Sequence, residues 1–202
     1  MSNPYTVVVW GDSIGASGWG ELMERGFNVA LNTGRPIRVV NQSVGGKPAS
    51  HARNEFDQRI KPIRPDLVII QFGFNDMRHD GSRGALPLST PEEFAEHLRF
   101  MVKCCHDVGA KVLLAANHRT RRTTTLPTGL AYDESRVRYG LVTRAIAAEL
   151  DVAFIDMAVA TLIPDAPWHD LVVADGVHLS QHGLEAYAGA MATAVMRIMA
   201  GA

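Results

Sequence analysis

One serine of the chain has the surroundings of a nucleophile. Ser13 lies in the segment Gly11–Gly15 (GDSIG), directly after a run of apolar residues that is typical of a buried strand. A glycine-flanked turn between a strand and a helix exposes a hydroxyl group beside backbone N–H groups and the positive end of the helix, which stabilise developing negative charge. Taken alone, the same turn is more simply explained as a helix cap, so the interpretation of Ser13 as a nucleophile requires a base and an acid elsewhere in the chain.

An aspartate and a histidine near the other end of the chain can supply them. Asp175 precedes His178 by three residues, just before the last predicted helix. At that spacing the carboxylate can accept the proton of one ring nitrogen and leave the other nitrogen free to act as a base. Two alternatives stay open: Asp175 caps the helix beside a solvated histidine, or His178 and His182 bind a metal ion, although no third ligand is nearby.

The order of these residues along the chain separates two kinds of serine hydrolase. The segment Gly11–Gly15 also matches the G-x-S-x-G elbow of the α/β-hydrolases, whose fold places several strands before the nucleophile and the acid far from the histidine. Here Ser13 follows the first predicted strand, and Asp175 and His178 share one tetrapeptide. The sequence therefore argues against the α/β-hydrolase fold but not against the chemistry of a serine nucleophile.

Two further turns carry groups that could stabilise an oxyanion. The second apolar run leads into the turn Asn41–Gly46, where Gly46 lets a backbone N–H group approach a substrate closely. The third apolar run ends just before Asn75, whose side chain can donate an N–H group. Asp12 and Asp76 lie beside these donors, and each is interpreted as a carboxylate that stabilises its turn.

Alternating strands and helices place these groups at one edge of a sheet. Uniformly apolar runs are typical of parallel strands covered on both faces, and their alternation with helical patterns predicts a doubly wound α/β fold. The predicted strands are Thr6–Trp10, Ile37–Asn41, Leu67–Phe72, Lys111–Ala116 and Val152–Ile155. The predicted helices are Gly18–Leu31, Ala49–Ile60, Thr90–Gly109 with an initial capping box, Glu134–Leu150, and one that begins near Ser180. The reactive groups mostly follow strands, so we expect them at the carboxyl edge, where such sheets bind ligands.

Two long polar connections follow strands at the same edge. They span Asp76–Ser89 and Asn117–Asp133, and loops of this length in compact domains are usually functional or mobile. The second contains the one dense cationic cluster of the sequence, with Arg119, Arg121 and Arg122. A solvated, mobile loop is the simpler interpretation. The alternative is that these arginines bind an anionic group of a substrate through paired hydrogen bonds.

Length and composition limit the class of protein. The chain has 202 residues, of which 47% are apolar and 20% charged, which suits one domain over residues 1–202 and excludes wholesale disorder. The net charge of -1 argues against nucleic acid or an anionic membrane surface as the main partner. Cys104 and Cys105 are adjacent and are predicted to be free thiols. The sequence shows neither a signal peptide nor a membrane-spanning run, so we expect a cytoplasmic location.

Together, these segments resemble the four sequence blocks of the SGNH (GDSL) hydrolases, in the same order and over about Val7 to Val195. The resemblance implies a three-layer flavodoxin-like sandwich with helices on both faces of a five-stranded parallel sheet of order 2-1-3-4-5. It also implies roles for the residues identified above. Ser13 would be the nucleophile, His178 the base and Asp175 its orienting acid, and the oxyanion hole would consist of the N–H groups of Ser13 and Gly46 and the side chain of Asn75.

One branch of this family, the carbohydrate O-acetylesterases, has a turn similar to residues 41–50. Two positions depart from the family pattern. Phe74 stands where that branch often has histidine, which weakens the expectation of a carbohydrate substrate. Leu179 follows His178 where many members have proline, which affects only the start of the last helix.

The sequence therefore predicts a serine esterase that hydrolyses short-chain carboxylic esters through an acyl-enzyme, with O-acetyl groups on a carbohydrate as one candidate substrate. Short acyl groups are expected because the two long loops are mostly polar and form no apolar lid. The alternatives are a thioesterase or lysophospholipase with the same catalytic residues, a non-catalytic binding module, and, with less support, a flavodoxin-like electron carrier. No metal or organic cofactor is expected, since the sequence has no dinucleotide-binding or P-loop motif. The sequence leaves open whether the protein forms a homo-oligomer.

Overall fold

A five-stranded parallel sheet runs through the protein, whose computed structural model describes residues 3–30, 35–161 and 167–201. The spatial order of the strands is β2-β1-β3-β4-β5. The strands are β1 (Tyr5–Gly11), β2 (Ile37–Asn41), β3 (Leu67–Gln71), β4 (Lys111–Ala116) and β5 (Ala153–Asp156). The predicted α/β fold and strand order are thus confirmed.

The uniformly apolar central strands follow from their position between two layers of helices. Val7, Val8 and Val9 of β1 are all fully buried, although successive side chains of a strand point to opposite faces. The edge strand β5 is only half-buried along its length. In the sheet register Gly11 of β1 pairs with Gln71 of β3, so the turns that follow these two strands begin side by side.

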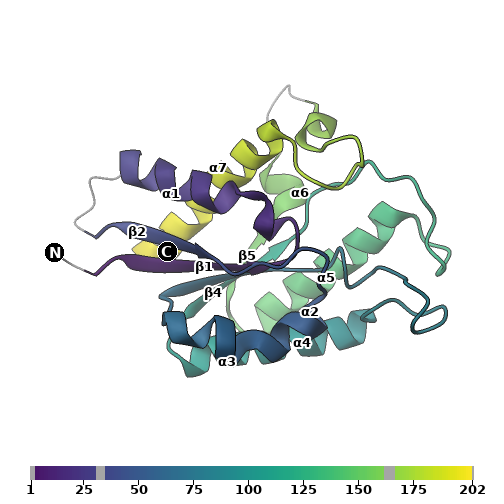
Figure 1. Cartoon of the computed structure of the whole chain (residues 1–202), viewed down its shortest axis with the longest axis horizontal. Coiled ribbons are helices and arrows are strands. Elements are labelled where there is room, and N and C mark those ends of the chain that lie inside the picture. Colours follow the sequence, from purple (N-terminus) through teal and green to yellow (C-terminus); the bar gives the residue numbers. More distant parts are fainter. Residues whose placement is uncertain (1–2, 31–34, 162–166, 202) are drawn as a thin grey trace.

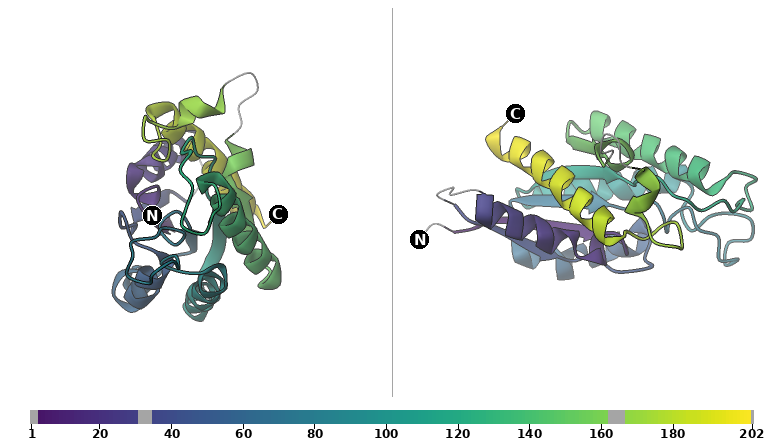
Figure 2. Two further views of the ribbon diagram at one scale, coloured as in Figure 1. Left: turned by 90° about the vertical axis from the view of Figure 1, so that its right-hand side faces the viewer. Right: turned by 90° about the horizontal axis from the view of Figure 1, so that it is seen from above.

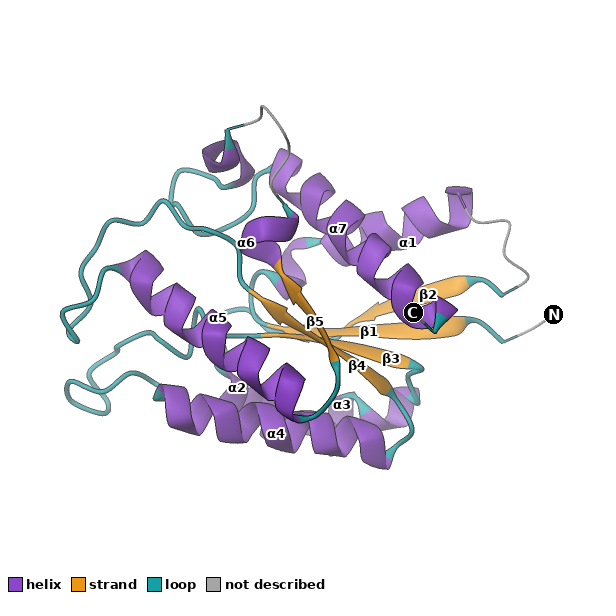
Figure 3. Ribbon diagram, turned by 180° about the vertical axis from the view of Figure 1, so that it is seen from behind, coloured by secondary structure: helices purple, strands orange, loops and turns teal. Residues whose placement is uncertain are grey.

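Helices cover both faces of this sheet (Figure 1). On one face α1 and α7 pack against each other with the short α6 beside α7, and α2 to α5 cover the other face (Figure 3). The helices are α1 (Trp19–Ala30), α2 (Ala49–Ala52), α3 (Phe56–Arg59), α4 (Pro91–Asp107), α5 (Tyr132–Glu149), α6 (Met157–Ala160) and α7 (Gln181–Ala200). None of the helices in the described part of the chain is long and apolar enough to cross a membrane.

The helix predicted over residues 49–60 is wrong as one continuous element. A 3-10 turn (Arg53–Glu55) separates α2 from α3, and at its end the backbone ψ angle of Glu55 is 1°, outside the helical range. Ala52 and Phe56 are nevertheless both buried, on either side of the turn. Tertiary packing keeps the apolar face and overrides the local helical geometry.

The capping box predicted at the start of α4 is confirmed, and it also holds the first long loop. Thr90 Oγ1 accepts the N–H of Glu93 at 3.3 Å, and the Glu93 carboxylate accepts the N–H of Thr90 at 2.8 Å. Arg83, inside the loop, donates two hydrogen bonds to the same carboxylate, at 2.6 and 2.7 Å. The loop therefore has a fixed attachment at the carboxyl edge, on which the left view of Figure 2 looks.

Replacing Glu93 with alanine tests this attachment. The hydrogen bonds from Arg83, followed by the one from the N–H of Thr90, lower the pKa of Glu93 to about 2 from its ordinary value of 4.5. A carboxyl group with a depressed pKa stabilises the folded state above its unfolded pKa, and this stabilisation is lost as the pH falls through the folded pKa. We expect Glu93→Ala to lower the free energy of unfolding by about 1 kcal/mol at pH 7.

The difference in free energy of unfolding between Glu93→Ala and wild type should shrink as the pH falls from 4.5 toward about 2. Urea unfolding at a series of pH values measures it. Glu92→Ala is the matched control, because Glu92 lies in the same first turn and its side chain has no hydrogen bond or ion pair with a described residue. A difference that stays constant across this pH range would contradict the role assigned to the Arg83 contact.

Candidate active site

The three residues proposed as nucleophile, base and acid lie together at the carboxyl edge of the sheet. His178 Nε2 is 3.0 Å from Ser13 Oγ, and His178 Nδ1 is 2.6 Å from Asp175 Oδ2. Because a carboxylate only accepts hydrogen bonds, Nδ1 carries the proton and Nε2 is free to accept the proton of the serine hydroxyl. Both ring nitrogens are therefore engaged, which leaves neither for the alternative of a metal site with His182.

A tight turn sets the position of Asp175. Its Oδ1 accepts the backbone N–H groups of Val177 at 2.8 Å and His178 at 2.9 Å. Burial raises the pKa of Asp175, but the hydrogen bonds from the His178 ring and from these two N–H groups outweigh it and lower the pKa to about 2. The cap of α7 is Ser180, whose Oγ accepts the N–H of Gly183 at 3.1 Å. Asp175 thus bonds to the histidine, and Ser180 rather than Asp175 caps the helix.

The proposed oxyanion donors surround Ser13. Gly45 lies against the serine, since a Cβ atom on it would be 3.8 Å from Ser13 Cβ, and this brings the turn with Gly46 to the nucleophile. Among the described residues, the backbone N–H groups of Ser13 and Gly46 have no hydrogen-bond acceptor. Asn75 Nδ2 donates to Asp12 Oδ2 at 3.3 Å, which leaves its second N–H hydrogen free. Three unoccupied donors of this kind can receive an oxyanion.

Two buried carboxylates hold the turns that carry these donors. Asp12 Oδ1 accepts the N–H of Ile14 at 2.9 Å, in addition to the contact with Asn75. Asp76 Oδ2 accepts the N–H of Gly73 at 3.1 Å, and its Oδ1 accepts the N–H of Ala49 at 3.0 Å. Burial raises the pKa of Asp12 to about 6 and that of Asp76 to about 7. Both side chains have the turn-stabilising contacts that the sequence analysis expected.

His118 lies behind the turn Asp175–His178, which is called the catalytic turn after the role proposed for His178, and this position of His118 was missed from the sequence. Its Nε2 is 2.8 Å from the backbone oxygen of Val177, the residue before His178. A carbonyl oxygen only accepts, so Nε2 carries the proton, and Nδ1 accepts from the Tyr187 hydroxyl at 2.5 Å. Burial lowers the pKa of His118 to about 4, which keeps the ring neutral. No local pattern reveals the contact with Val177, because it joins residues 59 positions apart.

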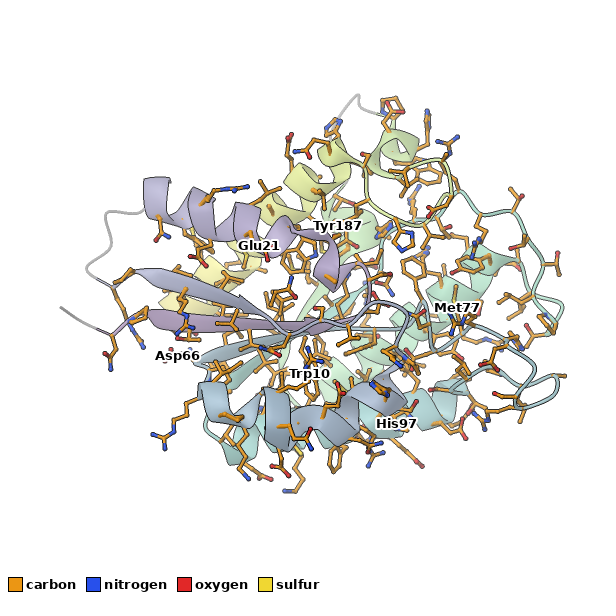
Figure 4. All side chains as sticks on the ribbon, viewed as in Figure 1. Trp10, Glu21, Asp66, Met77, His97 and Tyr187 are labelled. Carbon is orange, nitrogen blue, oxygen red and sulfur yellow. The ribbon has the colours of Figure 1, made fainter. Side chains whose placement is uncertain are left out.

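The Tyr187 hydroxyl leaves His118 only one tautomer. Tyr187 comes from α7 and lies between that helix and the sheet (Figure 4). Its oxygen accepts Gln71 Nε2 at 3.2 Å and the backbone N–H of His118 at 3.3 Å, which uses both of its lone pairs. The hydroxyl can then only donate to Nδ1. The proton on Nε2, and with it the hydrogen bond to the catalytic turn, is therefore determined by buried contacts.

The loop after β4 also holds Gly176 inside the catalytic turn. Thr120 Oγ1 donates to the Gly176 oxygen at 2.7 Å, and the N–H of Arg121 donates to it at 2.8 Å. Gly176 has a positive φ of 75°, and a Cβ atom on it would lie 2.9 Å from the backbone nitrogen of Arg122. Only glycine fits both constraints. The backbone of this loop therefore has fixed attachments that the interpretation as a solvated loop did not foresee.

The structure separates the three arginines of the loop. The Arg122 guanidinium lies over the ring of Tyr132, with its carbon 5.1 Å from the ring centre. Arg121 contacts the catalytic turn through its backbone. Arg119 lines a different hollow, next to Arg136 and Arg144. The side chain of Arg122 therefore lies over Tyr132, whose ring stacks on Phe74 beside Asn75, whereas that of Arg119 lies along a separate hollow.

Replacing His118 tests whether it positions the catalytic turn. His118→Phe keeps an aromatic ring beside Phe74 and Tyr187 but leaves the Val177 oxygen without its donor. We expect a stability loss of about 1–3 kcal/mol from the unpaired carbonyl. We also expect a fluorophosphonate to label Ser13 about 10- to 100-fold more slowly, because displacement of the turn misplaces His178.

The labelling rate is measured against pH at a temperature where the variants and wild type are folded. His118→Gln is the conservative variant, because its amide N–H can still donate toward the turn, and it should recover most of the rate. A lower melting temperature with an unchanged labelling rate in His118→Phe would reduce His118 to a purely structural residue.

The sequence is similar to a known family and to a curated esterase. The model of the GDSL-like lipase/acylhydrolase family matches residues 9–186. Esterase TesA of Pseudomonas aeruginosa is 31% identical over 116 residues, which are 54% of this chain and 52% of that protein. The chain thus matches about half the length of this curated relative.

Solved structures share the fold over nearly the whole chain. The lipase/acylhydrolase from Enterococcus faecalis is 22% identical with a TM-score of 0.77, and 94% of each chain is covered. The acetylxylan esterase Axe2 from Geobacillus stearothermophilus is 20% identical with a TM-score of 0.79, over 96% of this chain and 95% of that one. On the strength of the family match over residues 9–186, the chain belongs to the GDSL-like lipase/acylhydrolase family.

Proposed function

We propose that this protein hydrolyses carboxylic esters of short acyl groups through an acyl-enzyme formed on Ser13. The observation that carries the proposal is the 3.0 Å contact between Ser13 Oγ and His178 Nε2, on a ring whose other nitrogen is held by Asp175. A nucleophile, a base and an orienting acid in this geometry are the recurring arrangement of serine hydrolases. Such a site also needs hydrogen-bond donors for the oxyanion, and the free N–H groups near Ser13 can supply them.

The reaction has two steps. His178 Nε2 removes the hydroxyl proton as Ser13 Oγ attacks the ester carbonyl, and the resulting oxyanion accepts hydrogen bonds from Ser13 N–H, Gly46 N–H and Asn75. The imidazolium returns its proton to the leaving alkoxide, which departs as the alcohol and leaves the acyl-enzyme. His178 then removes a proton from water, whose oxygen attacks the acyl carbonyl, and Ser13 recovers its proton as the acid departs.

The surroundings of Ser13 support a short acyl group. The side chains of Asp175 and His178 are 41% and 49% exposed, so the catalytic groups are open to solvent. The hollow of about 490 Å³ between β5 and α7 has none of the proposed catalytic residues in its lining, so it offers no acyl pocket beside Ser13. The similar structures include an acetylxylan esterase, which supports O-acetyl groups on a carbohydrate as candidate substrates.

A substrate series tests this function. We expect kcat/KM to be highest for p-nitrophenyl acetate and to fall through the butyrate to the octanoate, with activity on acetylated xylose as the test of a carbohydrate substrate. Ser13→Ala should lower kcat by about 10⁴- to 10⁶-fold while the protein stays folded. A preference for the octanoate would favour the thioesterase or lysophospholipase alternative. Absence of both turnover and an acyl-enzyme burst would favour a binding module.

Asn75 provides a separate test of the oxyanion hole. Loss of one oxyanion donor lowers kcat by about 10²- to 10³-fold and leaves KM nearly unchanged. We expect this pattern for Asn75→Ala, with kcat, KM and the melting temperature measured together. Asn54→Ala is the control, because the Asn54 side chain donates only to the Ser50 carbonyl on an exposed surface. A lower melting temperature with normal kcat would show that Asn75 only shapes its turn.

A further inference from the structure

A cationic side chain lies at the rim of the proposed site, supported by aromatic rings. The guanidinium of Arg122 lies over the Tyr132 ring at 5.1 Å. Tyr132 in turn stacks on Phe74, with ring centres 6.2 Å apart and an angle of 24° between the planes. Phe74 directly precedes the oxyanion donor Asn75. Two ring contacts thus connect the position of the guanidinium to one wall of the site.

The backbone connects Arg122 to the opposite wall. Its N–H donates to Thr120 Oγ1 at 3.0 Å, and Thr120 itself donates to the oxygen of Gly176. The close approach between Gly176 and the backbone nitrogen of Arg122 brings this residue against the turn that carries His178. The backbone of Arg122 therefore lies against the turn that carries the proposed base, and its guanidinium lies over a ring that stacks on Phe74, the neighbour of Asn75.

A second cation lies on the first long loop. Arg78 is exposed, and its backbone N–H donates to the backbone oxygen of Asn75 at 3.1 Å. Burial raises the pKa of the Tyr132 phenol, and the charge of Arg122 over its ring acts against that rise. Two loops far apart in the sequence each contribute one arginine to this rim.

The carboxylates near this rim differ in their relation to the two arginines. Asp80, two residues from Arg78, has a lowered pKa, because it accepts hydrogen bonds from Ser82 and, to a smaller extent, because of the charge of Arg78. In the described part of the chain, neither Arg78 nor Arg122 forms an ion pair, although other arginines do, such as Arg83 with Glu93 at 2.6 Å. Asp175 is committed to His178 at 2.6 Å. Asp12 is fully buried and also affects the Tyr132 phenol, but its oxygens are bonded to Ile14 and Asn75. Among the described residues, the guanidinium of Arg122 thus carries a positive charge that no carboxylate pairs with.

We propose that Arg122 binds an anionic oxygen group, a carboxylate or a phosphate, on the ester substrate. This inference rests on the proposed esterase function and narrows its substrates to esters that carry such a group near the scissile bond. A guanidinium donates paired hydrogen bonds that match the oxygens of either group, and its stack on Tyr132 holds it ready to do so. Arg119 takes no part, because its side chain lies along a separate hollow.

Two acetate esters that differ only in one charge test the subsite. 4-Acetoxybenzoate is anionic and its methyl ester is neutral, and the enzyme would remove the same acetyl group from both. We expect wild type to prefer the anion, and Arg122→Gln to reduce the anion-to-neutral ratio of kcat/KM by about tenfold. A ratio is the readout because any loss of folded protein affects both esters equally. 4-Acetoxyphenyl phosphate in the same assay shows whether a phosphate is bound better than a carboxylate.

Two controls make the test specific. Arg119→Gln removes the same charge from the same loop and should leave the ratio unchanged, because its side chain faces the other hollow. Arg122→Lys keeps the charge without the paired donors and should give an intermediate ratio. High salt should lower the ratio of wild type toward that of Arg122→Gln, because exposed charge pairs are screened.

The outcomes separate the subsite from the esterase function. Hydrolysis of both esters with equal ratios in wild type, Arg122→Gln and Arg119→Gln would overturn the subsite and leave the esterase intact. An equal fall in the ratio for Arg119→Gln would also overturn the subsite, because it would show that the overall positive charge of the loop, and not Arg122 itself, favours the anion. No turnover of either ester and no phosphonate label on Ser13 would overturn the esterase function and the subsite with it.

Discussion

Buried hydrogen bonds to Asp12 and Asp76 hold the reactive edge of this protein together. Backbone turns at the end of a sheet have unpaired N–H groups, and in the interior such groups must find acceptors. Asp76 accepts from the turn after β3 and from the start of α2, while Asp12 accepts from the turn after β1 and from the side chain of Asn75. The carboxylates thus join three separate loops at fixed distances, and these bonds set the geometry of the proposed oxyanion donors.

The catalytic turn depends on a different support. The side chain of Asp175 orders the turn from inside, and the loop after β4 holds it from outside through His118, Thr120 and Arg121. A histidine base tolerates little displacement from its nucleophile, because the proton must pass along one hydrogen bond. The second long loop therefore has a structural function in addition to any contact with substrate.

The proposed site is open to solvent, which would give a bound substrate a part in the proposed reaction. Hydrogen bonds and charges act more strongly when water is excluded, and the half-exposed His178 and Asp175 lack that protection in the free protein. A substrate that covers these side chains would provide it. The guanidinium of Arg122 over Tyr132 is the charged contact that we propose for such a substrate.

The sequence by itself determined those features that depend on residues close together in the chain. The strands Ile37–Asn41 and Lys111–Ala116 and the cap at Thr90 were predicted as they are found, because burial and capping leave a local pattern. The pairing of Asp175 with His178 is also local, since the two side chains meet across one turn. The order of the sheet came from the family resemblance rather than from any such pattern.

Only the tertiary structure decided which distant residues meet. The break between α2 and α3, the single tautomer of His118 and the division of labour between Arg119 and Arg122 all depend on packing between segments far apart in the chain. Hydrogen bonds of this kind leave no periodic trace in the sequence, because each depends on one atom of one distant partner. The chemistry of the site can thus be read from residue types, whereas its precision comes from the way the loops are held.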